Sequence, residues 1–267
     1  MNADGVMILG ARGSMARGGR EFAEYGGATT CVLVSLNGTQ VVLDAGTGLL
    51  DLPDEVCALP RLALLLTHPH LDHLMGLPMC PYLSRKGAQL DMYAVPRVGE
   101  TLMQTLERLF APPIWPIGVD RLSAEVQVYP LPESMDLGGI HVETMEGSHP
   151  DGVTLFRLSG GGKSVVFATD CTFSEELMPK AAGFARGCDL LLADGQYFEQ
   201  EWAHCAGFGH STWRMALRLG ELSEAGRVCV VHHDPRHTDA MLAAAERDAQ
   251  VLFPHCTFAR EGEEISL

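Results

Sequence analysis

The stretch Thr67-His68-Pro69-His70-Leu71-Asp72-His73 places three imidazoles and one carboxylate within a few consecutive positions. It directly follows the apolar run 62–66, and such a run is typical of a buried strand. Imidazole and carboxylate groups are donors that suit divalent zinc, iron or manganese. A simple turn between a strand and a helix needs none of these four side chains, so the stretch predicts part of a metal site.

The composition is that of an ordinary globular protein. The chain of 267 residues is 46% hydrophobic and 20% charged. Residues 1–5 show no basic segment followed by an apolar one, so we expect no signal peptide. The sequence also has no apolar run near the roughly 20 residues that span a bilayer. We therefore expect a cytoplasmic protein without a membrane partner.

Cysteine spacing and net charge limit the partners. The eight cysteines are widely spaced and form no C-x-x-C motif, so we expect free, buried thiols. The formal net charge of −15 argues against a nucleic-acid polymer as partner, because affinity for nucleic acid rests largely on neutralising phosphates. A small anionic substrate is compatible with this charge if bound metal supplies the attraction. The oligomeric state stays open, with a homodimer among the alternatives.

Short apolar strands and amphipathic helices alternate along the chain, without a linker or a low-complexity tract. The strands cluster in each half, and helices become more frequent toward the end of each half. This order favours an α/β fold in which two packed mixed sheets carry outer helices, a four-layer α/β/β/α sandwich. We expect residues 1–267 to form a single domain. The predicted strands are 6–9, 31–35, 40–44, 62–66, 90–95, 126–131, 140–145, 153–158, 164–168, 190–193 and 228–231, and the predicted helices are 74–83, 98–110, 174–182, 211–224 and 238–249.

Several residues outside the first stretch allow two interpretations. Asp44 ends a predicted strand, where it either caps the next turn or orients a metal-binding histidine. The proline-rich segment 111–117 either packs on its own domain or forms a wall of the substrate pocket, with Trp115 facing the substrate. Tyr197 is either a core aromatic or a substrate contact. Arg12 could reach a phosphate, although we expect it to be exposed. Histidines outside the ligand pattern are expected on the surface or in the core: His141, His204, His237 and His255.

Other predicted strands also end in an Asp or a His. The strands that end near positions 145, 168 and 231 are followed by His149, by Asp170 and by the pair His232-His233. Residues distant in sequence can meet at the carboxyl edge of such sheets. We therefore expect these side chains to join the 67–73 stretch. His232 is preferred over His233 because it directly ends its strand.

The order of these motifs, with Ala168-Thr169-Asp170 and Val231-His232 among them, resembles the metallo-β-lactamase superfamily. The element Gly207-Phe208-Gly209-His210-Ser211 is most similar to the phosphodiesterase branch of that superfamily. This branch includes the tRNA 3′-end endonuclease and cyclic phosphodiesterases of phosphonate breakdown. The motif Asp194-Gly195-Gln196-Tyr197, with the N-terminal Arg-Gly-Ser and Tyr-Gly-Gly motifs, resembles a bacterial group of this type.

The resemblance implies the sandwich fold and two divalent metal ions per chain, with zinc expected and manganese or iron as alternatives. It implies that Asp170 bridges the two ions. Asp72 would also orient the attacking water. His210 is not needed as a ligand and is our candidate general acid for the leaving oxygen. The first ion would be held by His68, His70 and His149, and the second by Asp72, His73 and His232.

Together these residues predict a dinuclear metal-dependent hydrolase that acts on a small or cyclic phosphodiester. Two ions roughly 3.5–4 Å apart can lower the pKa of a shared water and generate hydroxide as the nucleophile. The first alternative is a thioester or lactone hydrolase on the same scaffold, although the Gly-His-Ser element counts against it. The second is a non-catalytic, metal-stabilised carrier similar to the B protein of pyrroloquinoline-quinone biosynthesis. Maturation of tRNA is not expected, because no long basic arm is visible in the sequence.

Overall fold

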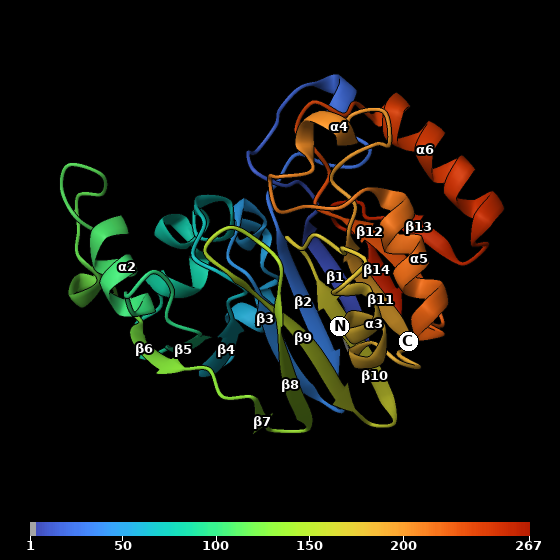
Figure 1. Cartoon of the computed structure of the whole chain (residues 1–267). Coiled ribbons are helices and arrows are strands. Elements are labelled where there is room, and N and C mark those ends of the chain that lie inside the picture. Colours follow the sequence, from blue (N-terminus) through green and yellow to red (C-terminus); the bar gives the residue numbers. More distant parts are fainter. Residues whose placement is uncertain (1–3) are drawn as a thin grey trace.

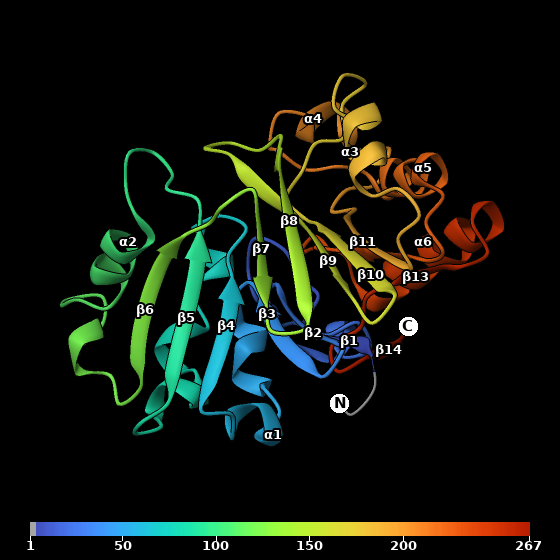
Figure 2. The same ribbon diagram turned by 90° about the horizontal axis from the view of Figure 1, so that it is seen from below.

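The computed structural model of the chain describes residues 4–267 and contains two mixed seven-stranded sheets (Figures 1 and 2). The strand order is β14-β1-β2-β3-β4-β5-β6 in the first sheet and β13-β12-β11-β10-β9-β8-β7 in the second. The first sheet consists of β1 (Gly5–Gly10), β2 (Cys31–Leu36), β3 (Thr39–Leu43), β4 (Arg61–Leu65), β5 (Gln89–Ala94), β6 (Glu125–Pro130) and β14 (Glu264–Ser266). The second consists of β7 (Ser134–Leu137), β8 (Ile140–Gly147), β9 (Val153–Gly160), β10 (Lys163–Ala168), β11 (Leu190–Asp194), β12 (Val228–Val231) and β13 (Cys256–Phe258).

Each sheet combines a parallel part with an antiparallel part. The neighbours from β3 to β6 are parallel, and so are those from β10 to β13. The remaining pairs in both sheets are antiparallel. Parallel neighbours end at the same edge of a sheet, so residues that follow them are brought together.

Helices cover the outer faces of the two sheets (Figure 1). On the second sheet, α3, α5 and α6 pack against one apolar cluster. On the first sheet, α2 and short 3₁₀ segments pack against another. The predicted four-layer α/β/β/α sandwich is therefore confirmed. The helices are α1 (Asp54–Cys57), α2 (Leu102–Leu109), α3 (Met178–Phe184), α4 (Trp202–Cys205), α5 (Trp213–Ser223) and α6 (Asp239–Leu252).

Successive residues of the central strands face different apolar clusters. In β4, Leu64 faces the outer cluster of the first sheet, and Leu65 faces the cluster between the sheets. In β10, Val165 faces the space between the sheets, and Val166 faces the helices of the second. Strands that are buried on both faces need unbroken apolar runs, because each buried aliphatic side chain contributes about 1.5–3 kcal/mol. The shared cluster between the sheets supports our proposal of one domain for residues 1–267.

Three predicted helices differ from the structure, and the one expected at 174–182 runs from Met178 to Phe184. Segment 74–83 is not an α-helix but contains two short 3₁₀ turns, Leu77–Met79 and Pro81–Ser84, because prolines that lack an N–H interrupt it. The helix expected at 98–110 begins only at Leu102. Thr101 caps it in a capping box with Gln104.

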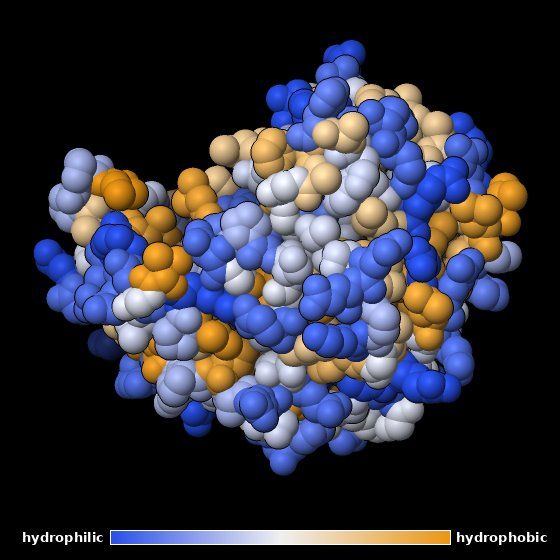
Figure 3. Space-filling model, in the orientation of Figure 1, coloured by the Kyte–Doolittle hydropathy of each residue, from blue (hydrophilic) through white to orange (hydrophobic). Residues whose placement is uncertain are grey.

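The short strands β7, β13 and β14 were not predicted. With three or four residues each, they carry too little alternation to be recognised. Strand β14 pairs with β1, so the two ends of the described chain meet in the first sheet. Within residues 4–267, no helix is long and apolar enough to cross a membrane. The surface facing the viewer in Figure 3 carries several separate hydrophobic patches among hydrophilic residues.

Candidate metal centre

Strand ends from both sheets converge at one place. The 67–73 stretch follows β4, and Asp170 and His232 follow β10 and β12 of the second sheet. His149 follows β8, which is antiparallel to β9 and therefore runs in the same direction as β10. The structure thus brings all seven residues predicted as ligands into two adjacent groups.

The first group consists of His68, His70 and His149. One ring nitrogen from each lies within 4.8 Å of the others. Nδ1 of His70 lies 3.1 Å from Nε2 of His149, too close for two N–H groups to face one another without a shared partner. The His70 side chain is 38% exposed, so this group is open to solvent.

The second group consists of Asp72, His73, Asp170 and His232, all of which are buried. Nε2 of His73 and Nε2 of His232 both lie 3.3 Å from Oδ2 of Asp72. They lie 3.3 Å and 3.1 Å from Oδ2 of Asp170. Two carboxylates and two imidazoles therefore point at a common centre.

Asp170 lies between the groups. Its Oδ1 is 3.8 Å from Nε2 of His68 in the first group, while its Oδ2 faces the second group. Asp170 itself has a left-handed backbone, with φ of 52°, at the point where the chain leaves β10. One carboxylate with an oxygen toward each group is the arrangement that a bridging ligand requires.

Hydrogen bonds fix the remote nitrogen of three imidazoles. Nδ1 of His149 donates to the Gly209 carbonyl at 2.9 Å, and Nδ1 of His73 donates to Asp44 at 2.8 Å. Nδ1 of His232 donates to Oε1 of Gln196 at 2.8 Å. Each of these contacts leaves Nε2 with a free lone pair directed at the cluster.

Asp44 supports both groups, which resolves the alternative left open by the sequence. Besides His73, its carboxylate accepts hydrogen bonds from the backbone N–H and the hydroxyl of Thr67. Because the Thr67 hydroxyl donates to Asp44, its oxygen is free to accept from Nδ1 of His68, 3.0 Å away. Asp44 therefore orients His73 directly and His68 through Thr67.

The charge within the cluster fits divalent cations. Burial lowers the pKa of His68 well below its usual range, so this imidazole is neutral. Burial raises the pKa of Asp170, but His232 and His73 outweigh this effect and hold the pKa well below its usual range. Burial lowers the pKa of His232, whereas Asp170 and Asp72 raise it to about 10. The carboxylates thus require positive charge beside them, and metal ions would supply it in place of protons.

Two unsatisfied atoms point to the same conclusion. Nε2 of His68 and Nε2 of His73 are buried and have no hydrogen-bond partner among the described residues. Such buried polar atoms are rare in native proteins. Since both atoms face the predicted metal positions, the donor set fits two divalent ions.

His210 lies beside both groups. Its Nδ1 is 2.9 Å from Oδ2 of Asp194, and its ring centroid lies 5.0 Å from that of His149 and 4.9 Å from that of His232. Asp194 ends β11 and also accepts the backbone N–H of Ser211. The carboxylate therefore sets which nitrogen of His210 carries the proton.

Tyr197 and His233 lie near the cluster but belong to neither group. Tyr197 is buried, accepts a hydrogen bond from Gln196 at 3.0 Å, and presents its ring edge-on to His210. His233 points away from the cluster, and its Nε2 bonds to the Ala259 carbonyl. Of the pair His232 and His233, only His232 therefore faces the cluster.

Trp115 agrees with one of its two interpretations, packing on its own domain, whereas Arg12 does not lie where we expected it. Trp115 packs against the outer apolar cluster of the first sheet, so its role toward a substrate stays a prediction. The expectation of an exposed Arg12 is wrong, because its side chain is fully buried. Its Nε and Nη1 donate to the backbone carbonyls of Gly26, Asp234 and His237, while Nη2 has no hydrogen-bond partner among the described residues and lies 3.9 Å from Oδ1 of Asp239.

Ser14, Asp194 and Gln196 belong to motifs that the sequence shows, but their role beside the cluster was not predicted. Gln196 and Ser14 contact predicted ligands, but an uncharged side chain gives no signal of this kind. The role of Asp194 could have been predicted, because Asp194 ends β11 at the same edge of the sheet where Asp170 follows β10.

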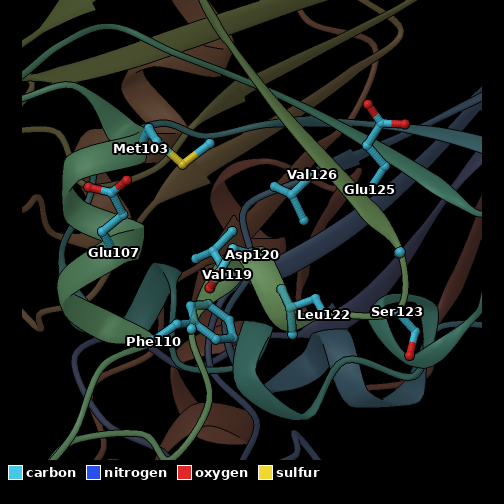
Figure 4. Close-up of a pocket in the computed structure, with 11 residues that line it drawn as sticks. Met103, Glu107, Phe110, Val119, Asp120, Leu122, Ser123, Glu125 and Val126 are labelled. Atoms are coloured by element: carbon cyan, nitrogen blue, oxygen red, sulfur yellow. The ribbon is translucent and has the colours of Figure 1, made fainter.

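A separate pocket of about 640 Å³ lies between α2 and β6 (Figure 4). Its lining combines apolar side chains such as Met103 and Phe110 with the carboxylates of Glu107, Asp120 and Glu125. None of the seven predicted ligands belongs to this lining. The cluster at the strand ends therefore remains the candidate site.

Comparison with known proteins agrees with this geometry. A family model described as the beta-lactamase superfamily domain matches residues 39–233. A ribonuclease Z from Synechococcus sp. (strain CC9902) is 30% identical over 141 residues, which are 51% of this chain and 43% of that protein. The chain thus matches less than half the length of that relative. A ribonuclease Z from Bradyrhizobium sp. (strain ORS 278) is 22% identical over 290 aligned positions, covering 88% of this chain and 93% of that protein.

Solved structures show the same fold. The metallo-beta-lactamase fold protein YhfI from Bacillus subtilis has a TM-score of 0.74 at 17% identity, with 99% of both chains covered. The short form of human tRNase Z has a TM-score of 0.70 at 18% identity, with 98% of both chains covered. A diphosphatase from the PhnP family has a TM-score of 0.71 at 18% identity, covering 98% of this chain and 97% of that one. At these identities the likeness concerns the fold alone.

Proposed function

The chain belongs to the beta-lactamase superfamily domain family, and from this premise we propose that it is a metal-dependent hydrolase of small phosphodiesters. The observation that carries the proposal is the position of Asp170, with one oxygen toward each of two groups of metal-binding side chains. A single-metal or structural site has no need of this second group. The relatives named ribonuclease Z support a phosphodiester as the bond that is cleaved.

We propose that the first ion is held by His68, His70 and His149, and the second by Asp72, His73 and His232, with Asp170 shared. Zinc is the metal we expect, with manganese or iron as alternatives, because the set contains only nitrogen and oxygen donors. Two bound divalent ions supply an activated water and positive charge for the phosphoryl oxygens.

The protein side chains around the ions contribute orientation and proton transfer. Asp72 faces the second position and, in this proposal, also orients the attacking water. As an imidazolium, His210 would donate its Nε2 proton to the leaving oxygen and remain neutral with its Nδ1 proton hydrogen-bonded to Asp194. Asp194 keeps the Nδ1 proton in place, and so holds His210 in a single orientation.

The two groups differ in how far their side chains are exposed to solvent. The side chains of His73 and His232 are fully buried, whereas His70 is partly exposed. A substrate therefore approaches from the side of the first group. The exposed side of the first group lies next to the Gly209 carbonyl, which accepts the hydrogen bond from His149.

Exposed apolar residues adjoin the site and suggest the substituent of the substrate. Phe208 precedes Gly209 and is 58% exposed, Leu71 lies between His70 and Asp72 and is 56% exposed, and Met15 is 50% exposed. Contiguous exposed apolar surface beside a polar centre is typical of a binding site, and these three side chains flank residues of the cluster in the sequence. We therefore propose a diester that carries an apolar or aromatic group.

A nucleic-acid polymer is a less suitable substrate in this proposal, although the named relatives are ribonucleases. The net charge of −15 gives the chain little capacity to neutralise a row of phosphates. The two ions act over a short distance only, because salt screens charge beyond about 8–10 Å. A small anion can reach them, whereas a long polyanion must also cross the acidic surface.

The test is a panel of substrates incubated with purified, metal-loaded protein. It contains bis-p-nitrophenyl phosphate, a 2′,3′-cyclic nucleotide, a precursor tRNA with a 3′ trailer, and a thioester and a lactone. We expect hydrolysis of the small diesters and little activity on the other three. Activity confined to the thioester or lactone would establish the alternative hydrolase. Silence on every substrate, with two ions bound, would favour a metal-stabilised carrier.

A further inference from the structure

A closed circuit of contacts joins the N-terminal Arg-Gly-Ser motif to the second group. The backbone N–H of Ser14 donates to Oδ2 of Asp72 at 2.8 Å, and that oxygen lies 3.3 Å from Nε2 of His232. Nδ1 of His232 donates to Oε1 of Gln196 at 2.8 Å. Nε2 of Gln196 lies 3.3 Å from the hydroxyl of Ser14, which closes the circuit.

Gly13 is packed against the ring of His232. A Cβ atom at this position would lie 2.1 Å from Nδ1 and 2.2 Å from Cε1 of that ring. Real Cβ atoms do not approach other atoms so closely, and the backbone of Gly13 is not in the left-handed region. The glycine is therefore required by the position of His232 and not by its own conformation.

Arg12 anchors the motif from behind. Its buried guanidinium donates to the carbonyl of Gly26 at 2.8 Å, to that of His237 at 2.7 Å, and to that of Asp234 at 3.1 Å. The adjacent backbone exchanges hydrogen bonds with His233, since His233 N–H donates to Ala11 and Gly13 N–H donates to His233. The segment that carries His232 is thus tied to the motif on both sides.

The first group does not depend on this circuit. His68 is held by Thr67 and His149 by the Gly209 carbonyl, and neither partner belongs to the motif. A change in the motif should therefore affect one metal position more than the other.

We propose that Arg12-Gly13-Ser14, together with Gln196, forms a positioning segment that sets the affinity of the second metal position. The inference rests on the metal centre of the proposed function, but not on its substrate. Partners that orient metal ligands typically contribute 10–100-fold to metal affinity. In this chain, that contribution comes from a loop of the first sheet acting on ligands that follow β4 and β12.

Two variants test the segment from different directions. Gly13→Ala adds one methyl group against the ring of His232, and Gln196→Leu removes the acceptor of Nδ1 without adding an atom next to the ring. Gly18→Ala is the matched control, because its Cβ would meet nothing within 4 Å in the same loop. Metal-free protein is titrated with Zn²⁺ against a chromophoric chelator and, separately, with Co²⁺ while visible absorption is recorded.

We expect two ions in the wild type and in Gly18→Ala. In both test variants we expect one ion at unchanged affinity, a second ion bound 10–100-fold more weakly, and a changed Co²⁺ spectrum for the second equivalent only. Two ions at wild-type affinity in both variants, or an equal loss of both ions from folded protein, would overturn the inference. If Gly13→Ala does not fold, the metal affinities and the Co²⁺ spectrum of Gln196→Leu decide the test.

The substrate proposal is tested separately by hydrolysis with the wild type. Wild-type hydrolysis with no effect of either variant on metal affinity defeats the positioning segment alone. Selective loss of the second ion in a protein that cleaves no diester defeats the proposed substrate alone.

Discussion

Nδ1 of His210 lies 2.9 Å from Oδ2 of Asp194, and both residues are buried beside the two groups of predicted metal ligands. The carboxylate accepts a hydrogen bond from Nδ1–H, so Nε2 is the ring nitrogen available for proton transfer. A general acid matters most where the leaving oxygen is strongly basic, as an alkoxide is, and little where it is a stable p-nitrophenolate. The pair therefore makes a prediction that depends on the leaving group.

We predict that His210→Ala lowers kcat on a 2′,3′-cyclic nucleotide by about 10²–10⁴-fold and changes kcat on bis-p-nitrophenyl phosphate far less. Asp194→Asn should likewise lower kcat on the cyclic nucleotide and change kcat on bis-p-nitrophenyl phosphate far less. Steady-state kinetics with metal content measured on the same samples checks this. An equal loss on both substrates would assign His210 to binding or structure and not to proton transfer.

Gly209 is predicted to be essential for the first metal position. Its φ is +89°, and a Cβ there would lie 2.3 Å from Nδ1 of His149. Gly209→Ala should displace His149, so that the chain keeps the second ion and binds the first at least 10-fold more weakly. Gly207→Ala, whose Cβ would meet nothing within 4 Å, is the control. Unchanged zinc affinity in Gly209→Ala would contradict the assignment of His149.

Phe208 is predicted to favour substrates with an aromatic group. Removing its exposed ring should lower kcat/KM for bis-p-nitrophenyl phosphate by about 10-fold, because one apolar contact is worth about 1–3 kcal/mol. We expect KM to rise while metal content stays constant. Val251→Ala, at an exposed apolar position of α6, should leave the kinetics unchanged. Identical kcat/KM values for Phe208→Ala and the wild type would rule out this surface as a substrate contact.

The Tyr-Gly-Gly motif is predicted to contribute to stability through Glu246. Its carboxylate accepts hydrogen bonds from Tyr25 at 2.6 Å, from Arg260 and from the Phe258 N–H. Burial raises the pKa of Glu246, but these bonds outweigh burial and lower the pKa below its usual value. A carboxyl group with a lowered pKa in the folded state stabilises the protein above its unfolded pKa, about 4.3, and loses this effect as the pH falls through the folded pKa.

Glu246→Gln should therefore lower the free energy of unfolding by about 1.5–3 kcal/mol at pH 7, with a smaller difference from the wild type below about pH 4. Urea denaturation at a series of pH values measures both quantities. Glu221→Gln, on an exposed position of α5, is the control. A difference that stays constant from pH 7 to pH 3 would contradict the role of the ionised carboxylate.

Much of the site could be predicted because its residues follow strands. His68, Asp170 and His232 each lie one or two residues after an apolar run, and parallel strands bring such positions to one edge. The same rule predicted a place for His149 in the site, because His149 follows shortly after the end of β8. The fold class followed from the alternation of strands and helices.

The contacts that orient the ligands could not be predicted in the same way. Ser14 meets Asp72 across 58 positions and Gln196 across 182, and neither separation leaves a periodic pattern. Arg12 was expected on the surface because a buried guanidinium needs several acceptors. Its acceptors are backbone carbonyls, two of them more than 220 positions away, and backbone groups carry no residue-specific signal.

The central claim is that two ions, held in two groups that share Asp170, perform the hydrolysis. It is tested most directly by adding Zn²⁺ stepwise to metal-free protein while the rate of bis-p-nitrophenyl phosphate hydrolysis is recorded. We predict little activity with one equivalent bound and a rise that ends at two equivalents, with Asp170→Asn nearly inactive throughout. Full activity at one equivalent, or no hydrolysis when two ions are bound, would contradict the account.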